Sequence, residues 1–227
     1  GTRTAAVSDN VTFTGNLGTF TTTVANTKTL TAAASVVNGK TINGDGNVAV
    51  TALDATAAAD LSSITNTGTR TAAVSDDVTF TGNLGTFTTT VATTKTMTAA
   101  ANVVAGKTVN KAGTGALAVQ IAGADAAVDL TTIAGSALST ITVTDNVTFT
   151  GTLDDAVKTS VNGTKTLTIA AAKATGKTID GAGNVSITAL DATAAADLSS
   201  ITNSGTRAAA VSENVTFTGD LGTFTTT

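Results

Sequence analysis

Short runs of alternating apolar and polar residues fill this chain. In VTFTG, Val11 and Phe13 fall on one side of an extended segment, while Thr12 and Thr14 fall on the other. The run NVAVT at 47–51 alternates in the same way. Such runs are rich in Thr and Val, which favour a pleated surface, and they are bounded by Gly, Asn or Ala. The pattern predicts short strands separated by corners.

The same neighbourhood returns along the chain at spacings of 67, 69 and 68 residues, as the four copies of VTFTG show: Val11–Gly15, Val78–Gly82, Val147–Gly151 and Val215–Gly219. Gly1–Thr23 and Gly68–Thr90 differ only at Asn10 against Asp77. We divide the chain into repeats 1–67, 68–136 and 137–204 and a partial repeat 205–227. Because Gly205–Thr227 realigns on Gly1–Thr23, we expect this sequence to be a slice of a longer one.

One repeat divides into three coils of 25, 20 and 22 residues, at 2–26, 27–46 and 47–68. A single coil of this size cannot bury its apolar side, but stacked coils pair every strand with its equivalent above and below. The sequence therefore predicts an all-β fold, one continuous parallel β-solenoid of about ten coils. The bias of parallel crossovers favours a right-handed β-helix.

The composition predicts a thin core. Hydrophobic residues make up 41% of the chain, but aromatic residues make up 3%, and Trp, Tyr, His, Cys and Pro are absent. All seven Phe fall in one type of coil, so each must pack against smaller residues of adjoining coils. We expect four of them inside, where Phe→Ala would cost about 3–5 kcal/mol: Phe13, Phe80, Phe149 and Phe217.

Length differences between repeats should fall at corners, where extra residues can bulge without disturbing the strands. The segment 43–50 is matched by the segment 110–119, which is two residues longer at its Gly-rich turn. A further insertion falls within 152–164.

Charge excludes some partners. The net charge is −4 and only 12% of residues are charged, so no basic field attracts a phosphate backbone, and we expect no nucleic-acid partner. No apolar run approaches about 18 residues, so we expect no membrane insertion of this segment. The absence of Cys excludes a disulfide framework.

Three GKT triplets resemble the end of a phosphate-binding loop, at Gly39–Thr41, Gly106–Thr108 and Gly176–Thr178. The first glycine of that motif is missing, because Ala34, Ala101 and Ala171 occupy its position. We interpret the triplets as coil corners. Their lysines are expected to cap edges and keep the protein soluble, together with Lys28, Lys95 and Lys165.

Carboxylates recur at two corners. Asp60, Asp129 and Asp197 precede strands expected to begin at the following leucine, and four others precede VTFTG: Asp9, Asp76, Asp145 and Glu213. A carboxylate there can accept backbone N–H bonds and shape the turn. The alternative is calcium, with two candidate pairs, Asp54 with Asp60 and Asp191 with Asp197. The middle repeat has Gly123 and Asp125 instead.

Catalysis has few candidates. Without His, Cys or Tyr, the Ser–His–Asp and Cys–His groupings and His metal sites cannot form. A carboxylate-only polysaccharide enzyme would need an unrepeated acidic cluster, which the sequence lacks. Outward Thr ladders such as Thr12 and Thr14 could order water, but Ala49 interrupts the array in a following coil. We expect no enzyme, no catalytic residue and no cofactor.

The units TKTLTAAA and GKTINGDGNVAVTALDATAAADLSSIT resemble bacterial β-strand-repeat surface proteins, which are very large Thr/Ala/Gly/Val-rich adhesins, and in composition some S-layer proteins. The resemblance implies an extracellular location on a bacterial cell surface and a scaffolding or adhesive role, and it assigns no functional residue. We expect a non-catalytic stalk, filament or surface-layer segment that self-associates into a fibre or lattice. The alternative is an adhesin or phage-fibre module that grips a surface glycan through one solenoid face, which requires an exposed row unbroken over consecutive coils.

Overall fold

The computed structural model describes residues 3–211 and 213–226, and its parallel strands stack as a β-solenoid of about 11 turns. The predicted all-β solenoid is confirmed, and only 10% of the chain is helical. The chain divides into two compact units. Unit 1 comprises Gly1–Ala99, Gly106–Leu117 and Ile133–Ala137, and unit 2 comprises Ala100–Ala105, Ala118–Thr132 and Leu138–Thr227.

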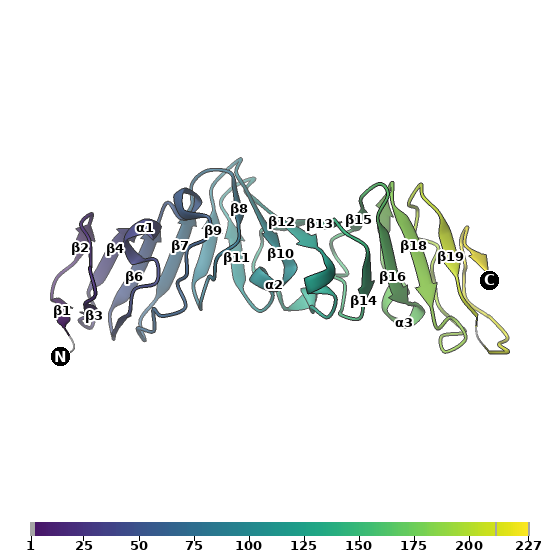
Figure 1. Ribbon diagram of the computed structural model, residues 1–227, viewed down its shortest axis with the longest axis horizontal. Helices are drawn as coiled ribbons and strands as arrows, with labels where there is room; N and C mark the ends of the chain where they lie inside the picture. The colour runs from purple at the N-terminus through teal and green to yellow at the C-terminus, as the bar shows by residue number, and fades with distance from the viewer. Residues whose placement is uncertain (1–2, 212, 227) are drawn as a thin grey trace. The chain divides into compact units, whose positions relative to one another are not determined.

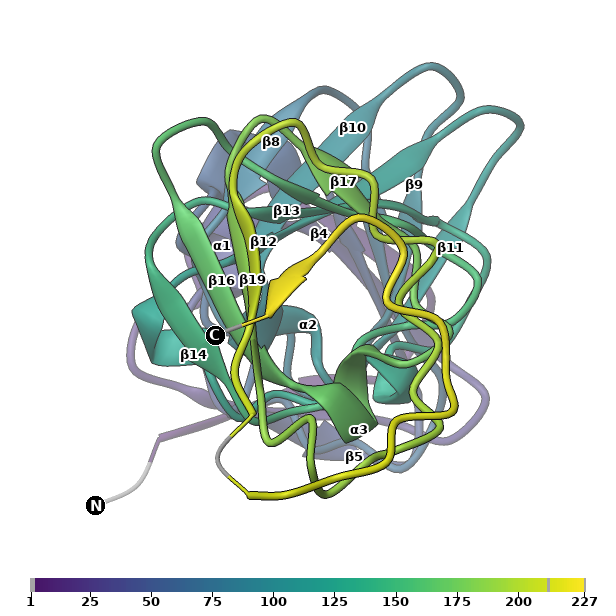
Figure 2. The ribbon, with the colours of Figure 1, turned by 90° about the vertical axis from the view of Figure 1, so that its right-hand side faces the viewer.

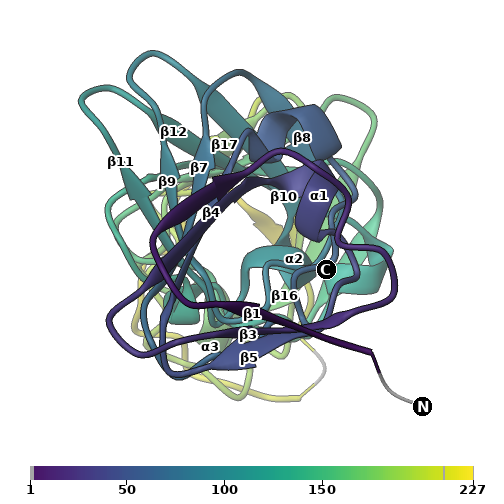
Figure 3. The same cartoon turned by 90° about the vertical axis from the view of Figure 1, so that its left-hand side faces the viewer.

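Unit 1 builds its sheets by stacking parallel strands (Figure 1). One sheet has the order β1-β3-β5, a second has the order β11-β9-β7-β6-β4-β2, and β8 pairs with β10. Figure 3 shows β1, β3 and β5 side by side at the edge of this unit. The elements are β1 (Thr4–Val7), β2 (Val11–Phe13), β3 (Thr21–Val24), β4 (Thr29–Ala33), α1 (Ala34–Val37), β5 (Ile42–Gly44), β6 (Asn47–Thr51), η1 (Leu53–Thr56), β7 (Arg70–Val74), β8 (Val78–Phe80), β9 (Thr88–Val91), β10 (Thr96–Ala100) and β11 (Thr108–Lys111).

Unit 2 follows the same plan. It contains the strand order β13-β15-β17 and the sheet β14-β16-β18-β19-β20, whose strands β14, β16 and β19 are labelled in Figure 2. In this sheet β18 lies between β16 and β19. Its elements, with β12 beginning in unit 1, are α2 (Ala101–Val104), β12 (Ala116–Ile121), η2 (Gly123–Asp125), η3 (Leu130–Thr132), β13 (Leu138–Val143), β14 (Val147–Phe149), β15 (Thr159–Val161), β16 (Thr166–Ala170), α3 (Ala171–Ala174), β17 (Ile179–Gly181), β18 (Asn184–Thr188), β19 (Arg207–Ala209) and β20 (Thr225–Thr226).

The core forms because like side chains stack in register from coil to coil. In the β2-β4-β6 ladder, Val11 pairs with Leu30 and Leu30 with Val48. Leu30 and Val48 are each 1% exposed, while residues between them on the strands face outward. The alternation seen in the sequence therefore sets which side of each strand meets the interior.

Two of the four phenylalanines predicted to be inside are fully buried, Phe80 and Phe149. The prediction is wrong for Phe13 and Phe217, which are only partly buried. β2, β8 and β14 each end a sheet. The corners at Ala57 and Ala126 cover the ends of β8 and β14, where they accept the backbone N–H groups of Thr81 and Thr150, whereas the described residues place no such corner over β2. Burial in a solenoid depends on a neighbour on each side, so an identical residue at an edge stays partly exposed.

The coil and the sequence repeat have different lengths. Paired strands lie 17 to 22 residues apart, as in Thr4 with Thr21 and Val48 with Arg70. In unit 1, β1 pairs with β3, but its repeat equivalent β7 lies in the other sheet, between β6 and β9. In unit 2, β13 and its equivalent β19 are likewise in different sheets. Each repeat therefore covers more than three coils, which refines the predicted division and gives about 11 turns.

Corners hold the insertions, as expected, and they also hold short helical turns that the sequence analysis did not predict. The Ala-rich segments after β4, β10 and β16 form four-residue helices α1, α2 and α3. The longer turn between β11 and β12 and the insertion between β14 and β15 both lie outside strands. The strands predicted to begin at Leu61, Leu130 and Leu198 are wrong. Asp60, Asp129 and Asp197 make isolated bridges there, and Leu130 begins η3.

Candidate functional site

The lysines of the GKT triplets join each corner to the coil before it. Each ammonium group donates to a backbone carbonyl 22 or 24 residues earlier, so the interpretation as coil corners is confirmed. The Nζ–O distances are 2.9, 2.5 and 3.0 Å for Lys40 to Gly18, Lys107 to Gly85 and Lys177 to Leu153. A charge-assisted bond of this kind satisfies a carbonyl at the corner, where the strand ladder is interrupted.

A second set of lysines forms ion pairs with the carboxylates that precede VTFTG. The N–O distances are 3.3, 2.6 and 3.5 Å for Lys28 with Asp9, Lys95 with Asp76 and Lys165 with Asp145. Sequence reasoning found both residue sets but missed their pairing. Their separations of 19, 19 and 20 residues match the offset between neighbouring coils, and that match is the signal that could have revealed them.

Hydrogen bonds and ion pairing lower the pKa of Asp9 and of Asp76. At Asp76, the hydrogen bond from Lys95 is the largest influence, and it lowers the pKa of the carboxyl below its usual range. The same bond raises the pKa of Lys95. At Asp9, the backbone N–H of Asn10 contributes most to the lowered pKa and Lys28 contributes next.

The predicted turn-shaping role of the other carboxylates is also confirmed. Asp60, Asp129 and Asp197 each accept a backbone N–H bond and a hydroxyl bond from the residue two positions later. The hydroxyl distance is 2.6 Å in all three. The hydroxyl of Ser62 lowers the pKa of Asp60, and that of Ser199 lowers the pKa of Asp197.

The calcium candidates Asp54, Asp60 and Asp197 each accept hydrogen bonds from a different serine. Asp54 accepts both the backbone N–H and the hydroxyl of Ser75, at 2.6 and 2.9 Å. Burial of this carboxyl opposes ionisation, but the two Ser75 bonds outweigh it and the pKa of Asp54 is lowered. In the middle repeat, Asp125 is 2% exposed and accepts backbone N–H bonds from Asn102 and Ala122. Over residues 3–211 and 213–226, no group of three or more acidic side chains gathers as a metal would require, around Asp60, Asp191 and Asp197 included.

Two buried asparagines were missed by sequence reasoning. The Asn66 Nδ2 group donates to the carbonyl of Gly46 at 2.7 Å, and Asn203 donates to Gly183 at the same distance. Both side chains are fully buried. The backbone is tightly packed at this bond. A Cβ built at Gly68 would lie 2.3 Å from the carbonyl oxygen of Gly46, the same oxygen that accepts the bond from Asn66. The sequence signal that could have located these asparagines is the Asn-x-Gly spacing, which occurs in two repeats. The middle repeat has Gly135 and Ala137 at the same positions.

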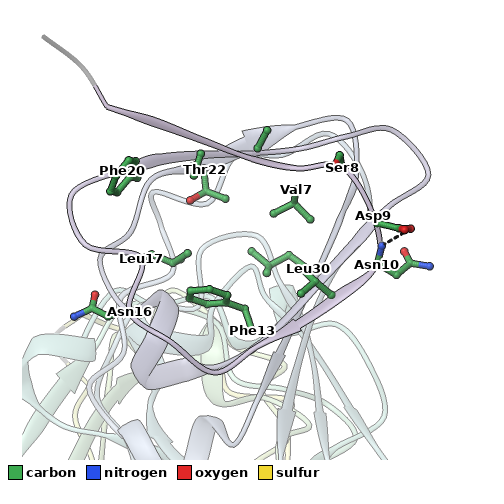
Figure 4. A pocket seen from close by; sticks show the side chains of 13 residues that line it. Val7, Ser8, Asp9, Asn10, Phe13, Asn16, Leu17, Phe20, Thr22 and Leu30 are labelled. Carbon is green, nitrogen blue, oxygen red and sulfur yellow. Dashed lines mark hydrogen bonds between the residues drawn. The ribbon is translucent and has the colours of Figure 1, made fainter.

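A hollow lies at the edge of unit 1, inside the coil that contains β1 and β2. It has a volume of about 520 Å³. Figure 4 shows Val7, Phe13, Leu17 and Leu30 directed into it. Val11 and Phe20, at its rim, are 38% and 39% exposed and are the large hydrophobic residues that the described surface exposes most. Its lining residues come from β1, β2, β3, β4 and the segments before and after β2, and most of them are apolar.

The helices of the described residues are all too short or too polar to cross a membrane. No protein-family model, no curated protein and no solved structure matches the chain. The lysines, carboxylates and asparagines of the repeats together form a joint between neighbouring coils, which recurs along the solenoid.

Proposed function

We propose that this chain is a non-catalytic structural protein, an extracellular stalk, filament or surface-layer segment on a bacterial cell surface, whose role is to provide length and stiffness. The observation that carries this proposal is that the repeated polar residues are used to join one coil to the next. Lys40 reaches the carbonyl of Gly18, Lys95 pairs with Asp76, and Asn66 binds Gly46.

This use of the charged residues favours a mechanical role over a binding role. The alternative adhesin needs the same exposed residue in coil after coil on one side of the solenoid. Because β1 and its repeat equivalent β7 lie in different sheets, repeated residues move to another side with each repeat. On the sheet β2-β4-β6-β7-β9-β11, one row of outward residues holds Thr12, Thr31, Ala49, Thr71, Thr88 and Thr108 on consecutive coils. Ala49 interrupts the threonines, so this row is not the unbroken one that the adhesin requires.

Resistance to unfolding tests the proposal. In backbone hydrogen exchange, the amides of β4, β6, β9, β16 and β18 should exchange only through rare opening, because each pairs on both sides in its ladder. Trypsin should cleave slowly, although the chain has 12 Lys and Arg residues. Exchange and cleavage at the rates of an unfolded chain would overturn the structural role.

Location needs a separate test. Antibody labelling of intact cells that produce the protein should detect it from outside, and electron microscopy of the labelled surface should place it in fibres or a lattice. Labelling that appears only after the cells are opened would contradict the extracellular assignment. Release of a sugar from surface polysaccharide by the purified chain would contradict the non-catalytic assignment.

A further inference from the structure

The chain contains three Asn-Gly pairs, and the fold gives them different surroundings. They are Asn38–Gly39, Asn43–Gly44 and Asn162–Gly163. Asparagine is a thermolabile residue, and glycine after it is the least protective neighbour, because no side chain keeps the glycine nitrogen away from the asparagine amide. When that nitrogen reaches the side-chain carbon Cγ, it can close a succinimide ring. Contacts that hold the two groups apart therefore decide which pair reacts.

The first pair is held by the next coil. The side-chain oxygen of Asn38 accepts the backbone N–H of Asp60, and the backbone N–H of Gly39 donates to the carbonyl of Asp60, both at 2.8 Å. The attacking nitrogen and the attacked amide are thus each bound to the same residue. Ring closure would have to break both bonds, so this pair is protected although it is exposed to solvent.

The second pair is held in a strand. Asn43 and Gly44 belong to β5, and both are only partly exposed. The side-chain oxygen of Asn43 accepts the hydroxyl of Thr23 from the preceding coil, at 2.8 Å. A Cβ built on Gly44 would lie 2.3 Å from the carbonyl oxygen of Val24, so the glycine is packed closely against that coil. Strand pairing and this close packing keep the glycine nitrogen from turning toward the asparagine side chain.

The third pair is not held in this way. Asn162 and Gly163 lie in the turn between β15 and β16, and both are exposed. Among the described residues, neither the side chain of Asn162 nor the backbone N–H of Gly163 has a hydrogen-bond partner. The reacting groups of this pair are therefore free to meet.

The turn itself does not need the asparagine. Alanine stands at the same position in the other two repeats, as Ala25 and Ala92, and the residue at this position donates its backbone N–H to a valine of the preceding coil in all three. The third residue of the turn has φ of 66°, 63° and 65° in Thr164, Thr27 and Thr94. One backbone conformation therefore forms with either residue, and the chain provides its own unreactive versions of this turn.

We propose that Asn162–Gly163 is a site of spontaneous covalent modification, where this chain slowly converts asparagine into aspartate and isoaspartate and thereby loosens one contact between coils. The nitrogen of Gly163 attacks Cγ of Asn162 and forms the N–Cγ bond. The Cγ–Nδ2 bond breaks, and the side-chain nitrogen leaves as ammonia with the proton lost by the attacking nitrogen. Water then opens the ring, at Cγ to give aspartate or at the backbone carbonyl carbon to give isoaspartate. The inference does not depend on the proposed structural role.

Isoaspartate changes the backbone at a contact between coils. The chain then runs through the side-chain carbon, and the former carbonyl of residue 162 becomes a free carboxylate. In the unmodified turn that carbonyl accepts the backbone N–H of Lys165 at 3.0 Å, and a Cβ built on Gly183 of the next coil would lie 2.3 Å from it. A displaced, charged group at so close a contact should loosen the pairing of β15 with β17.

Peptide mass spectrometry of the purified full chain, aged in mildly alkaline buffer, measures the conversion at each pair. Each event replaces an amide by an acid and raises the peptide mass. The Asp-Gly pairs at 45–46 and 180–181 can also form isoaspartate, but without a change in mass. The peptide with Asn162 should convert at least roughly tenfold faster than those with Asn38 and Asn43, because these must first open their bonds to other coils. In denaturant, where no coil protects any pair, the three rates should become similar.

Two variants copy the turn of the second repeat. Asn162→Ala introduces the residue found at Ala92, and it should remove the mass change and leave thermal unfolding unaltered. Gly163→Thr introduces the residue found at Thr93, and it should slow the conversion several-fold, because a β-branched side chain hinders approach of the nitrogen. A Cβ on Gly163 meets only the Cβ of Ala182, at 3.7 Å, so the second variant should also fold normally.

Hydrogen exchange measures the consequence for the fold. After aging, the amides of β15 and β17 should exchange faster in the wild type and at their original rate in Asn162→Ala. Equal conversion at the three pairs of the folded chain, or faster conversion at Asn38 or Asn43, would overturn the assignment of the site. Conversion that leaves the exchange of both strands unchanged would overturn the loosening. Neither result would alter the slow exchange and slow proteolysis of the fresh protein, on which the structural role is tested.

Discussion

Two segments of unit 1 have almost the same sequence and different surroundings. Gly1–Thr23 and Gly68–Thr90 differ at one position in 23, yet Val11 is 38% exposed where Val78 is 9%, and Phe20 is 39% exposed where Phe87 is 1%. β2 and β8 each end a sheet, but the corner after η1 covers β8, where Thr81 donates its backbone N–H to Ala57, whereas no described corner covers β2. Comparing the two segments separates the effect of a coil's own residues on its structure and burial from the effect of the neighbouring coils.

The backbone is the same in both segments. Phe20 and Phe87 each donate a backbone N–H to the leucine three residues earlier, at 3.3 and 3.1 Å, and Gly18 and Gly85 have φ of 57° and 56°. Asn16 and Asn83 both accept the glycine N–H that follows two residues later, at 2.7 and 2.9 Å. Local sequence therefore determines the path of the coil, and stacking determines burial.

The largest expected effect is at the phenylalanines. Phe80→Ala should destabilise the coil that contains β8 by about 3–5 kcal/mol, because the ring is fully buried and its removal leaves a cavity. Phe13→Ala should cost clearly less, since its ring already borders the open hollow. Hydrogen exchange of the amides in β8 and β2 measures each local free energy of opening. Equal losses in the two variants would show that the hollow is closed in solution.

The next effect is at the glycines of VTFTG. Gly82→Ala forces a methyl group against the carbonyl of Ala59 and should cost roughly 1–3 kcal/mol through separation of the two coils. Gly15→Ala should change the free energy of unfolding by less than about 0.5 kcal/mol, as expected for a surface position. Denaturant unfolding of the two variants makes the comparison. A large loss in Gly15→Ala would mean that another part of the chain covers this edge.

The same pair shows how far sequence reasoning reaches. Alternation in VTFTG and the return of that segment were sufficient to predict a parallel solenoid, because strand faces and self-stacking follow from period alone. They could not predict that Phe13 and Phe80 differ in burial, since the residue types do not indicate which coil is covered by a neighbouring one. The number of residues per coil also depends on corner conformation, which is why β7 joins the sheet of β6 and not that of β1.

Some of the polar contacts between and within coils could be predicted from the sequence, and others could not. The carboxylates at Asp9 and Asp60 were correctly predicted to shape turns, because an acceptor just before a turn can reach its own backbone. The pairing of Lys28 with Asp9 needed the coil offset as well as the residue types. The Asn-x-Gly spacing could have drawn attention to Asn66, but it could not predict that the side chain is buried, since asparagine near glycine is expected in an exposed turn.

Acid should reveal a smaller difference between the two segments. The lowered pKa of Asp76 means that its stabilising contribution is complete above the ordinary pKa of about 3.9 and is lost as the pH falls through the still lower folded value. The raised pKa of Lys95 has the opposite sign, so its contribution is lost only when the pH rises through its folded value. Both contributions are present at neutral pH.

Carboxyl NMR titrations can test which group lowers each pKa. Lys95→Gln should move the midpoint of Asp76 upward, because Lys95 is its largest influence. Lys28→Gln should move that of Asp9 less, because the Asn10 amide contributes most there and the ion pair is longer, 3.3 Å against 2.6 Å. Equal movements would show that the two ion pairs are equivalent in solution and that the uncovered edge does not loosen the first.

The smallest effect is expected where the two sequences differ. The backbone N–H of Thr29 donates to the side-chain oxygen of Asn10 at 2.9 Å, and that of Thr96 donates to the side-chain oxygen of Asp77 at 2.7 Å. The amide and the carboxylate therefore accept the same hydrogen bond from the next coil. Asn146 makes that bond with Thr166 in unit 2, at 2.9 Å. Asp77→Asn should therefore change the free energy of unfolding by less than about 0.5 kcal/mol at neutral pH. In that variant the two 23-residue segments are identical, so any difference in exchange that remains between β2 and β8 belongs to stacking alone. If their exchange rates converge instead, the single carboxylate accounts for the contrast and the neighbouring coil does not.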